Sequence, residues 1–273
     1  MQIELLGCTS TGKSTLARYA VEVARERRKE IVMGDDFVLQ GFGFGFVRGR
    51  LARTLLLDVF ALFASIQSWR KYRGFFRFAL RVISRAPLSA LQKLNAGRNV
   101  LKKVGIYEII RQAGREQIVL VDEGTVGEAH GLFVHVSSEP SLTEVAAFAS
   151  LVPLPDVAVH VRECESLLVE RTLARGHKRI PARSRNDANV FVTRAVRMFD
   201  ELCRQVRGAT TWLVVDGGRI IVADQAKFLR PHYDLVPGII QAALEKVNPA
   251  EIIQCRPDQE RTTTECQKLL STN

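Results

Sequence analysis

The sequence lacks the features of disulfide-rich, zinc-binding and membrane-spanning proteins. Its five cysteines are widely spaced and include no C-x-x-C pair, so we expect neither a disulfide framework nor a zinc ribbon. The longest apolar stretch, Leu55–Ile66, is interrupted by Asp58 and is far shorter than the roughly 20 residues of a membrane span. The first residues lack the basic flank and cleavage site of a secretory signal. These absences predict a cytoplasmic protein.

Acidic residues are almost missing from one part of the chain. The 273 residues carry a net charge of +10, and the segment Arg48–Lys103 contains 13 Lys or Arg but only one acid, Asp58. The remaining residues together are nearly neutral, with a net charge of −2. The positive charge is therefore concentrated in one segment, which is where an anionic partner would bind.

Short apolar strands alternate with amphipathic helices along the chain. Strands are expected at Gln2–Leu6, Ile31–Met33, Ile118–Val121, Val157–Val161 and Trp212–Val215, and helices at 15–29, 141–151, Glu165–Arg175, Ala188–Val206 and Leu235–Val247. Such alternation predicts an α/β fold with a parallel sheet covered by helices on both faces. We expect a single domain over residues 1–247, followed by a loosely ordered tail over 248–273.

The segment Gly7-x-x-x-x-Gly12-Lys13-Ser14 matches the phosphate-binding loop, with a strand before it and a helix after it. In such a loop the backbone N–H groups converge on the phosphates, while Lys13 reaches the β and γ phosphates and Ser14 ligates Mg²⁺. We therefore predict that ATP and Mg²⁺ bind here. The residues expected to contact the nucleotide are Gly7, Thr9, Ser10, Thr11, Gly12, Lys13, Ser14 and Thr15.

Acidic residues follow the second and third expected strands, at the edge where open α/β sheets bind ligands. Asp122 is predicted to hold Mg²⁺ together with Ser14, the alternative being a cap or turn residue. Glu123 could orient water, bind substrate or satisfy a loop. Asp35 or Asp36 could accept the proton of an attacking hydroxyl, or form a plain turn.

A basic segment follows the fourth strand. Arg171 and Arg175 lie four residues apart and therefore share one face of the expected helix. The loop after this helix contains His177, Lys178, Arg179, Arg183 and Arg185. A mobile lid over about residues 171–187 could close on a triphosphate and stabilise the charge of the transferring group. A solvated basic surface is the alternative.

These motifs together resemble those of the nucleoside and nucleoside monophosphate kinases, with thymidylate kinase and the deoxynucleoside kinases nearest in layout. The resemblance covers residues 1–36, 116–123 and 155–247. It implies a three-layer α/β/α P-loop fold with five parallel strands in the order 2-3-1-4-5, lid arginines at Arg171 and Arg175, and adenine near Asp216-Gly217. The chain departs from this family at Asp122-Glu123-Gly124, where thymidylate kinases have Asp-Arg and deoxynucleoside kinases have Glu-Arg-Ser. This departure argues against a thymidine-type substrate.

Residues 47–115 form a basic helical insertion between the second and third strands, which the resemblance leaves unmatched. Leu51, Leu55, Val59, Leu62, Phe63 and Ile66 recur at helical spacing, and Arg73, Arg77, Arg81 and Arg85 lie four apart on the next helix. The arginines could bind an anionic acceptor or be solvated. With Trp69, Phe75, Phe76 and Phe78 they could instead contact an anionic membrane or a nucleic acid.

The motifs favour an ATP- and Mg²⁺-dependent phosphotransferase that acts on a small polar or anionic acceptor, such as a nucleoside, a nucleotide or a related metabolite. Its catalytic side chains would be Lys13, Asp35 or Asp36, Arg171 and Arg175. The alternative is a P-loop ATPase or switch whose insertion engages a membrane or a partner; a nucleic-acid binder is the weakest of the three hypotheses. The sequence leaves open the acceptor, the choice between ATP and GTP, and whether the protein forms a homodimer.

Overall fold

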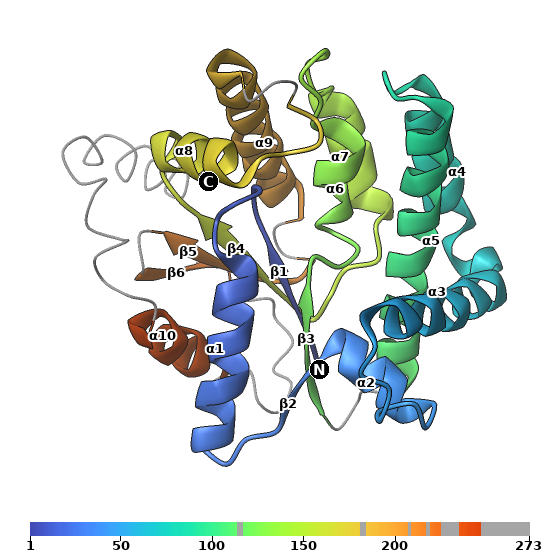
Figure 1. Ribbon diagram of the computed structural model, residues 1–273, viewed down its shortest axis with the longest axis vertical. Coiled ribbons are helices and arrows are strands. Elements are labelled where there is room, and N and C mark those ends of the chain that lie inside the picture. The colour runs from blue at the N-terminus through green and yellow to red at the C-terminus, as the bar shows by residue number, and fades with distance from the viewer. Residues whose placement is uncertain (114–116, 181–183, 207–208, 217–218, 225–234, 247–273) are drawn as a thin grey trace.

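Six strands form one mixed sheet, and helices flank it (Figure 1). The computed structural model describes residues 1–113, 117–180, 184–206, 209–216, 219–224 and 235–246. The strands are β1 (Gln2–Leu6), β2 (Ile31–Met33), β3 (Ile118–Asp122), β4 (Val157–Arg162), β5 (Thr211–Asp216) and β6 (Arg219–Asp224). The helices are α1 (Lys13–Glu26), α2 (Gly34–Gly41), α3 (Arg50–Gln67), α4 (Trp69–Arg85), α5 (Ala90–Ala113), α6 (Glu128–Phe133), α7 (Leu142–Leu151), α8 (Glu165–Arg175), α9 (Arg185–Val206) and α10 (Leu235–Lys246).

The strand order is β2-β3-β1-β4-β5-β6, in which the first five strands run parallel in the expected sequence. The expectation of a purely parallel, five-stranded sheet is wrong, because β6 pairs with β5 in the antiparallel direction. Only two residues separate β5 from β6, and so short a connection can join only antiparallel neighbours. The apolar run Ile220–Val222, which the strand assignment above omitted, was the available signal.

Side-chain alternation along β1 assigns the two faces of the sheet. Ile3 and Leu5 belong to a buried cluster with α1 and α10, whereas Leu6 belongs to a cluster with α6, α7 and α9. Because successive side chains of a strand point to opposite faces, Glu4 lies on the side of Leu6. The sheet is therefore covered by helices on both faces, as the alternation of strands and helices predicted.

The chain after β2 differs from the expected strand end. β2 stops at Met33, opposite Leu120, whereas β3 continues to Asp122. Asp35 and Asp36 therefore lie in the first turn of α2 and do not extend the strand. Two carboxylates at this position favour a helix, since they complement the partial positive charge of its N-terminus.

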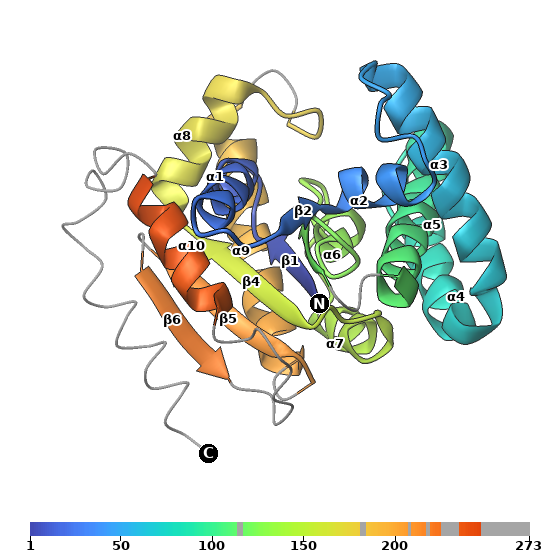
Figure 2. The same ribbon diagram turned by 90° about the horizontal axis from the view of Figure 1, so that it is seen from below.

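The basic insertion is built from α3, α4 and α5, which stand at the side of the sheet away from β6 and α10 (Figures 1 and 2). The second half of α5 is also part of the core, because Ile106 and Ile110 pack with Val119 and Val121 of β3. Among the described residues, no single helix combines the length and apolar composition of a membrane span. α3 and α4 pass that test only as a pair, and they bend by 106° at their junction.

Candidate phosphate-binding site

The loop between β1 and α1 has the backbone that a phosphate-binding loop requires. Gly7 and Gly12 have φ values of 144° and 89°, in the region that favours glycine. A Cβ atom at Gly7 would overlap the carbonyl oxygen of Val161, so this position has no room for a side chain. Within the described part of the chain, no side chain caps the N-terminus of α1. Its first N–H groups are therefore available to an anion.

Lys13 is folded over this loop and is only 6% exposed. Its Nζ donates hydrogen bonds to the carbonyl oxygens of Gly7, at 2.9 Å, and Cys8, at 2.7 Å. The same nitrogen lies 3.2 Å from the carboxylate of Glu123. The ammonium group is thus held at the loop by oxygen acceptors, which phosphate oxygens could replace.

Ser14 and Asp122 meet as predicted. Ser14 Oγ donates a hydrogen bond of 2.5 Å to Asp122 Oδ2. Asp122 Oδ1 is buried and has no hydrogen-bond partner among the described residues. A hydroxyl and a carboxylate with one unsatisfied oxygen fit Mg²⁺, which prefers oxygen ligands and takes the rest from phosphates and water. In keeping with such a partial set, the described residues include no cluster of three or more His, Cys, Asp or Glu side chains that could hold a metal alone.

Glu4 fixes the turn that follows β3. Its carboxylate accepts hydrogen bonds from the backbone N–H groups of Gly127, at 2.7 Å, and Val126, at 3.3 Å. Burial raises the pKa of Glu4 to about 7, because the charged form loses its hydration. A Cβ atom at Gly124 would lie 2.6 Å from the same carboxylate. A side chain at this position would therefore require Glu4 to move.

Glu123 begins the same turn with a left-handed φ of 62°. Its N–H donates to the carbonyl oxygen of Leu5 at 3.1 Å, and its own carbonyl oxygen accepts a hydrogen bond from Lys103 Nζ of α5. The backbone of Glu123 is therefore held from both sides, while its side chain, although 57% exposed, points to Lys13. The geometry does not select one of the three roles considered for Glu123, but it adds a contact with Lys13.

The expected lid begins beside the loop, and part of it is anchored. Thr172 of α8 is buried, and its hydroxyl lies 3.4 Å from Ser10 Oγ. Arg171 Nη1 lies 3.8 Å from the carboxylate of Glu163, and Arg175 is exposed at the end of α8. Arg179 is fixed by hydrogen bonds to the carbonyl oxygens of His130, Gly131 and Val134, at 3.4, 3.0 and 2.9 Å. Arg179 is thus attached to the segment around α6, and the mobility of the lid stays a prediction; Arg183 lies outside the described residues.

The remaining predicted residues are not brought to the loop. Asp36 forms an ion pair with Arg53 of α3, and Asp35 is exposed. In the part of the chain that is described, neither aspartate bonds to residues 7–15. Asp216 ends β5 opposite Arg162, two strands away from β1. Gly217 lies outside the described residues.

Sequence reasoning missed four contributors to the site: Glu4, Lys103, Thr172 and the anchoring role of Arg179. Glu4 alone had a local signal, since it is the only charged residue inside the apolar run Gln2–Leu6. The other three act through partners far away in the chain, which no local pattern reveals.

The site as a whole brings a cation, a hydroxyl, a carboxylate and free backbone amides to one end of β1 and β3. Neither a protein-family model nor a curated protein matches this chain.

Proposed function

We propose that the protein is an ATP- and Mg²⁺-dependent phosphotransferase that acts on a small polar or anionic acceptor. The proposal rests mainly on the contact of 2.5 Å between Ser14 and Asp122, next to Lys13 and the uncapped start of α1. The resemblance of the motifs to nucleoside and nucleoside monophosphate kinases also supports it.

In the proposed mechanism the loop amides and Lys13 hold the β and γ phosphates. Ser14 Oγ and Asp122 would hold Mg²⁺, which supplies positive charge to the phosphate oxygens when it is bound. Arg171 and Arg175 approach from α8, whose Thr172 contacts the loop. Their guanidinium groups would neutralise the charge that develops on the transferring group.

The two candidate bases differ in their surroundings. Asp36 is paired with Arg53, which directs its carboxylate toward α3. Asp35 is exposed in the same helical turn. For a hydroxyl acceptor we therefore assign proton acceptance to Asp35 and a positioning role to Asp36. For a phosphate acceptor no strong base is needed, and arginines of the insertion would bind it.

One observation favours an ATPase as the second candidate. The carboxylate of Glu123 lies 3.2 Å from Lys13 Nζ, and this lysine marks the γ-phosphate end of a phosphate-binding loop. A carboxylate there could orient water for hydrolysis. In that case ATP hydrolysis would drive a conformational change at a partner, and no phosphoryl group would be transferred to an acceptor.

Calorimetry and product analysis test both candidates. Wild-type protein should bind ATP in the presence of Mg²⁺, and Asp122→Asn should lose the dependence on Mg²⁺ while keeping its fold by circular dichroism. A screen of hydroxyl and phosphate acceptors with labelled ATP should then yield a labelled acceptor. Inorganic phosphate alone in every mixture, with hydrolysis lost in Glu123→Gln, would favour the ATPase. Absence of nucleotide binding by folded wild-type protein would refute both.

A further inference from the structure

Helix α3 exposes its large apolar side chains to solvent. Its packed face consists of Leu57 and small residues such as Ala61 and Ala64. The exposed apolar side chains, with exposed fractions from 46% to 88%, are Leu51, Leu55, Val59, Leu62, Phe63 and Ile66. They follow the whole helix, which at 18 residues is about 27 Å long. An apolar stripe of this length is unusual on a surface that contacts only water.

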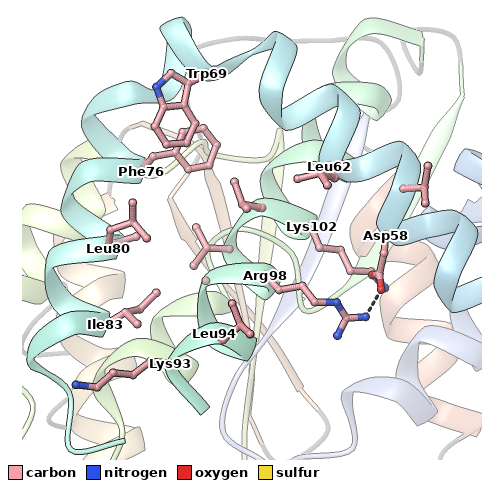
Figure 3. Close-up of a pocket in the computed structure, with 15 residues that line it drawn as sticks. Asp58, Leu62, Trp69, Phe76, Leu80, Ile83, Lys93, Leu94, Arg98 and Lys102 are labelled. Atoms are coloured by element: carbon pink, nitrogen blue, oxygen red, sulfur yellow. Dashed lines mark hydrogen bonds and ion pairs between the residues drawn. The ribbon is translucent and has the colours of Figure 1, made fainter. Parts of the chain in front are cut away.

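A groove of about 510 Å³ opens beside this stripe, between α3, α4 and α5 (Figure 3). Its apolar walls are formed by Val59, Leu62, Trp69, Phe76, Ala79, Leu80, Ile83, Leu94, Val100 and Leu101. Three basic side chains, Lys93, Arg98 and Lys102, also line it, and the last two pair with Asp58. The groove therefore combines a hydrocarbon interior with cationic edges.

The exposed side of α4 adds unpaired positive charge to the same region. Arg73, Arg77 and Arg81 are exposed and have no acidic partner among the described residues. Leu80, which lies between two of these arginines, is 52% exposed and lines the groove. The arginines therefore border the apolar surface.

We propose that the apolar side of α3, the groove and the arginines of α4 form a docking surface for an anionic lipid bilayer. The side chains of α3 lie among the upper acyl chains, the arginines contact lipid phosphates, and the groove accepts one acyl chain. Docking of this kind is peripheral and leaves the three helices folded on the sheet. It needs no bound nucleotide, so vesicle binding without ATP tests it separately from the proposed catalytic function.

A bilayer fits this surface better than a second copy of the chain or a nucleic acid. In a symmetric dimer the segment Arg48–Lys103, with 13 basic residues and one acid, would face itself and repel. A single-stranded nucleic acid needs exposed aromatic rings on which its bases stack. Of the aromatic residues that the sequence offered for that role, Phe75 and Phe76 are 2% and 1% exposed and Trp69 stacks on Phe76, whereas the exposed apolar side chains of α3 are aliphatic apart from Phe63.

Sedimentation with vesicles tests the proposal. The full chain should bind vesicles of phosphatidylglycerol and phosphatidylcholine at least tenfold more tightly than vesicles of phosphatidylcholine alone, and salt should weaken this binding. Replacing Leu55, Phe63 and Ile66 together by serine should lower the affinity at least tenfold. The matched variant Leu55→Met, Phe63→Leu, Ile66→Leu, which keeps the apolar character, should bind like wild type.

The arginines are tested in the same assay. Arg73→Gln, Arg77→Gln and Arg81→Gln together should lower the affinity for anionic vesicles about 100-fold. The matched control removes three exposed arginines from α1 and the turn that follows it, on the other side of the molecule, at Arg18, Arg25 and Arg28. This control loses the same net charge and should bind almost as tightly as wild type. Equal loss in both variants would show that only net charge matters, and would overturn the docking surface.

Trp69 reports whether the groove takes part. It is 40% exposed and stacks on Phe76 in the groove, whereas Trp212, the other tryptophan, is fully buried. Anionic vesicles should shift the emission to shorter wavelength, brominated acyl chains should quench it, and Trp69→Phe should abolish both effects. Failure of wild-type protein to bind anionic vesicles would overturn the proposal, as would concentration-dependent dimerisation or oligonucleotide binding in its place.

Discussion

Two regions of the molecule use charged residues in opposite ways. One is the phosphate-loop edge, which consists of Glu4, residues 7–15 and the turn 122–127, and the other is the helical insertion, residues 47–115. At the edge, Lys13 and Glu4 are buried and satisfied by backbone groups of neighbouring turns. In the insertion, Arg73, Arg77 and Arg81 are exposed and without acidic partners among the described residues. A buried charge that is satisfied by the backbone fixes geometry, whereas exposed charges beside apolar side chains leave interaction energy for a partner.

The difference suggests that the two regions can be disabled separately. The catalysis that we propose for the edge would depend on a few atoms within hydrogen-bond distance, so single substitutions should have large effects there. The docking that we propose for the insertion would depend on many weak and similar contributions. Single substitutions there should therefore have small effects on vesicle binding, and only groups of substitutions should have large effects. Each prediction below compares the two regions on this basis.

The largest effect is expected for Lys13→Met. The substitution keeps the aliphatic volume of the side chain but removes the ammonium group that contacts Gly7, Cys8 and Glu123. Losing such a stabilising group lowers turnover by about 100- to 1000-fold. Turnover of labelled ATP by the variant measures the effect, and vesicle binding by the same variant should stay unchanged.

The control for Lys13→Met is Lys93→Met, which removes a lysine from the groove. Lys93 Nζ donates only to the carbonyl oxygen of Ser84, at 2.7 Å, among the described residues. Its loss should leave turnover unchanged and weaken vesicle binding slightly. Comparable turnover by Lys13→Met and wild type would contradict the assignment of the phosphate loop.

Glu4→Gln should give the next largest effect, on stability and with a defined pH dependence. Burial raises the pKa of Glu4 from 4.5 to about 7, so the folded protein binds a proton that the unfolded chain releases. The contribution of Glu4 to the free energy of unfolding of the wild type therefore falls as the pH rises from about 4.5 to about 7, and it is constant above that range. The difference in pKa corresponds to about 3 kcal/mol.

Denaturant unfolding of both chains at pH 4, 5, 6, 7 and 8 isolates this contribution. The buried histidines titrate in both chains and cancel in the difference between them, and Glu128, whose pKa burial also raises to about 7, contributes to that difference only through its interaction with Glu4. The free energy of unfolding of Glu4→Gln, relative to that of wild type, should rise by about 3 kcal/mol between pH 4 and pH 8. Glu26→Gln, at an exposed glutamate paired with Lys246, is the control for the loss of a surface carboxylate. A constant difference between Glu4→Gln and wild type would mean that folding does not shift the pKa of Glu4.

Local spacing predicted the contact between Ser14 and Asp122 at the edge, but not which face of α3 is buried in the insertion. Gly7, Gly12, Lys13 and Ser14 are close in the chain, and the loop they form needs no distant partner to define it. Asp122 was also predicted, because it ends a strand adjacent to β1. Glu4 was missed because its partners, Val126 and Gly127, are more than 120 residues away.

In the insertion, the spacing predicted the helix α3 but could not say which face it buries. Apolar residues at helical spacing usually mark the core face. Here the large ones, such as Leu55 and Ile66, are exposed, and Ala61 is buried. The cause lies in α5, where Gly105 has no side chain and lets the backbone of α3 approach closely at Ala61, while Leu57 packs elsewhere on the same face. A residue more than 40 positions away thus decides the orientation of α3.

The close approach at Gly105 gives the last and smallest predicted effect. A Cβ atom at this position would overlap the backbone of Ala61, so Gly105→Ala should force α3 and α5 apart. We expect a loss of about 1–3 kcal/mol in the free energy of unfolding. Gly97→Ala in the same helix is the matched control, because nothing lies within 4 Å of a Cβ atom there. That control should gain about 0.5–1 kcal/mol, since alanine favours helix more than glycine does.

The same pair of variants distinguishes composition from geometry in the docking surface. Both keep every arginine and every exposed leucine of the insertion, but only Gly105→Ala changes how α3 lies beside the groove. Weaker vesicle binding by Gly105→Ala than by Gly97→Ala, at temperatures where both are folded, would mean that the helices must be held in this arrangement. Equal binding would mean that the apolar and basic residues suffice in any helical arrangement. The insertion would then not depend on exact geometry, whereas the edge does.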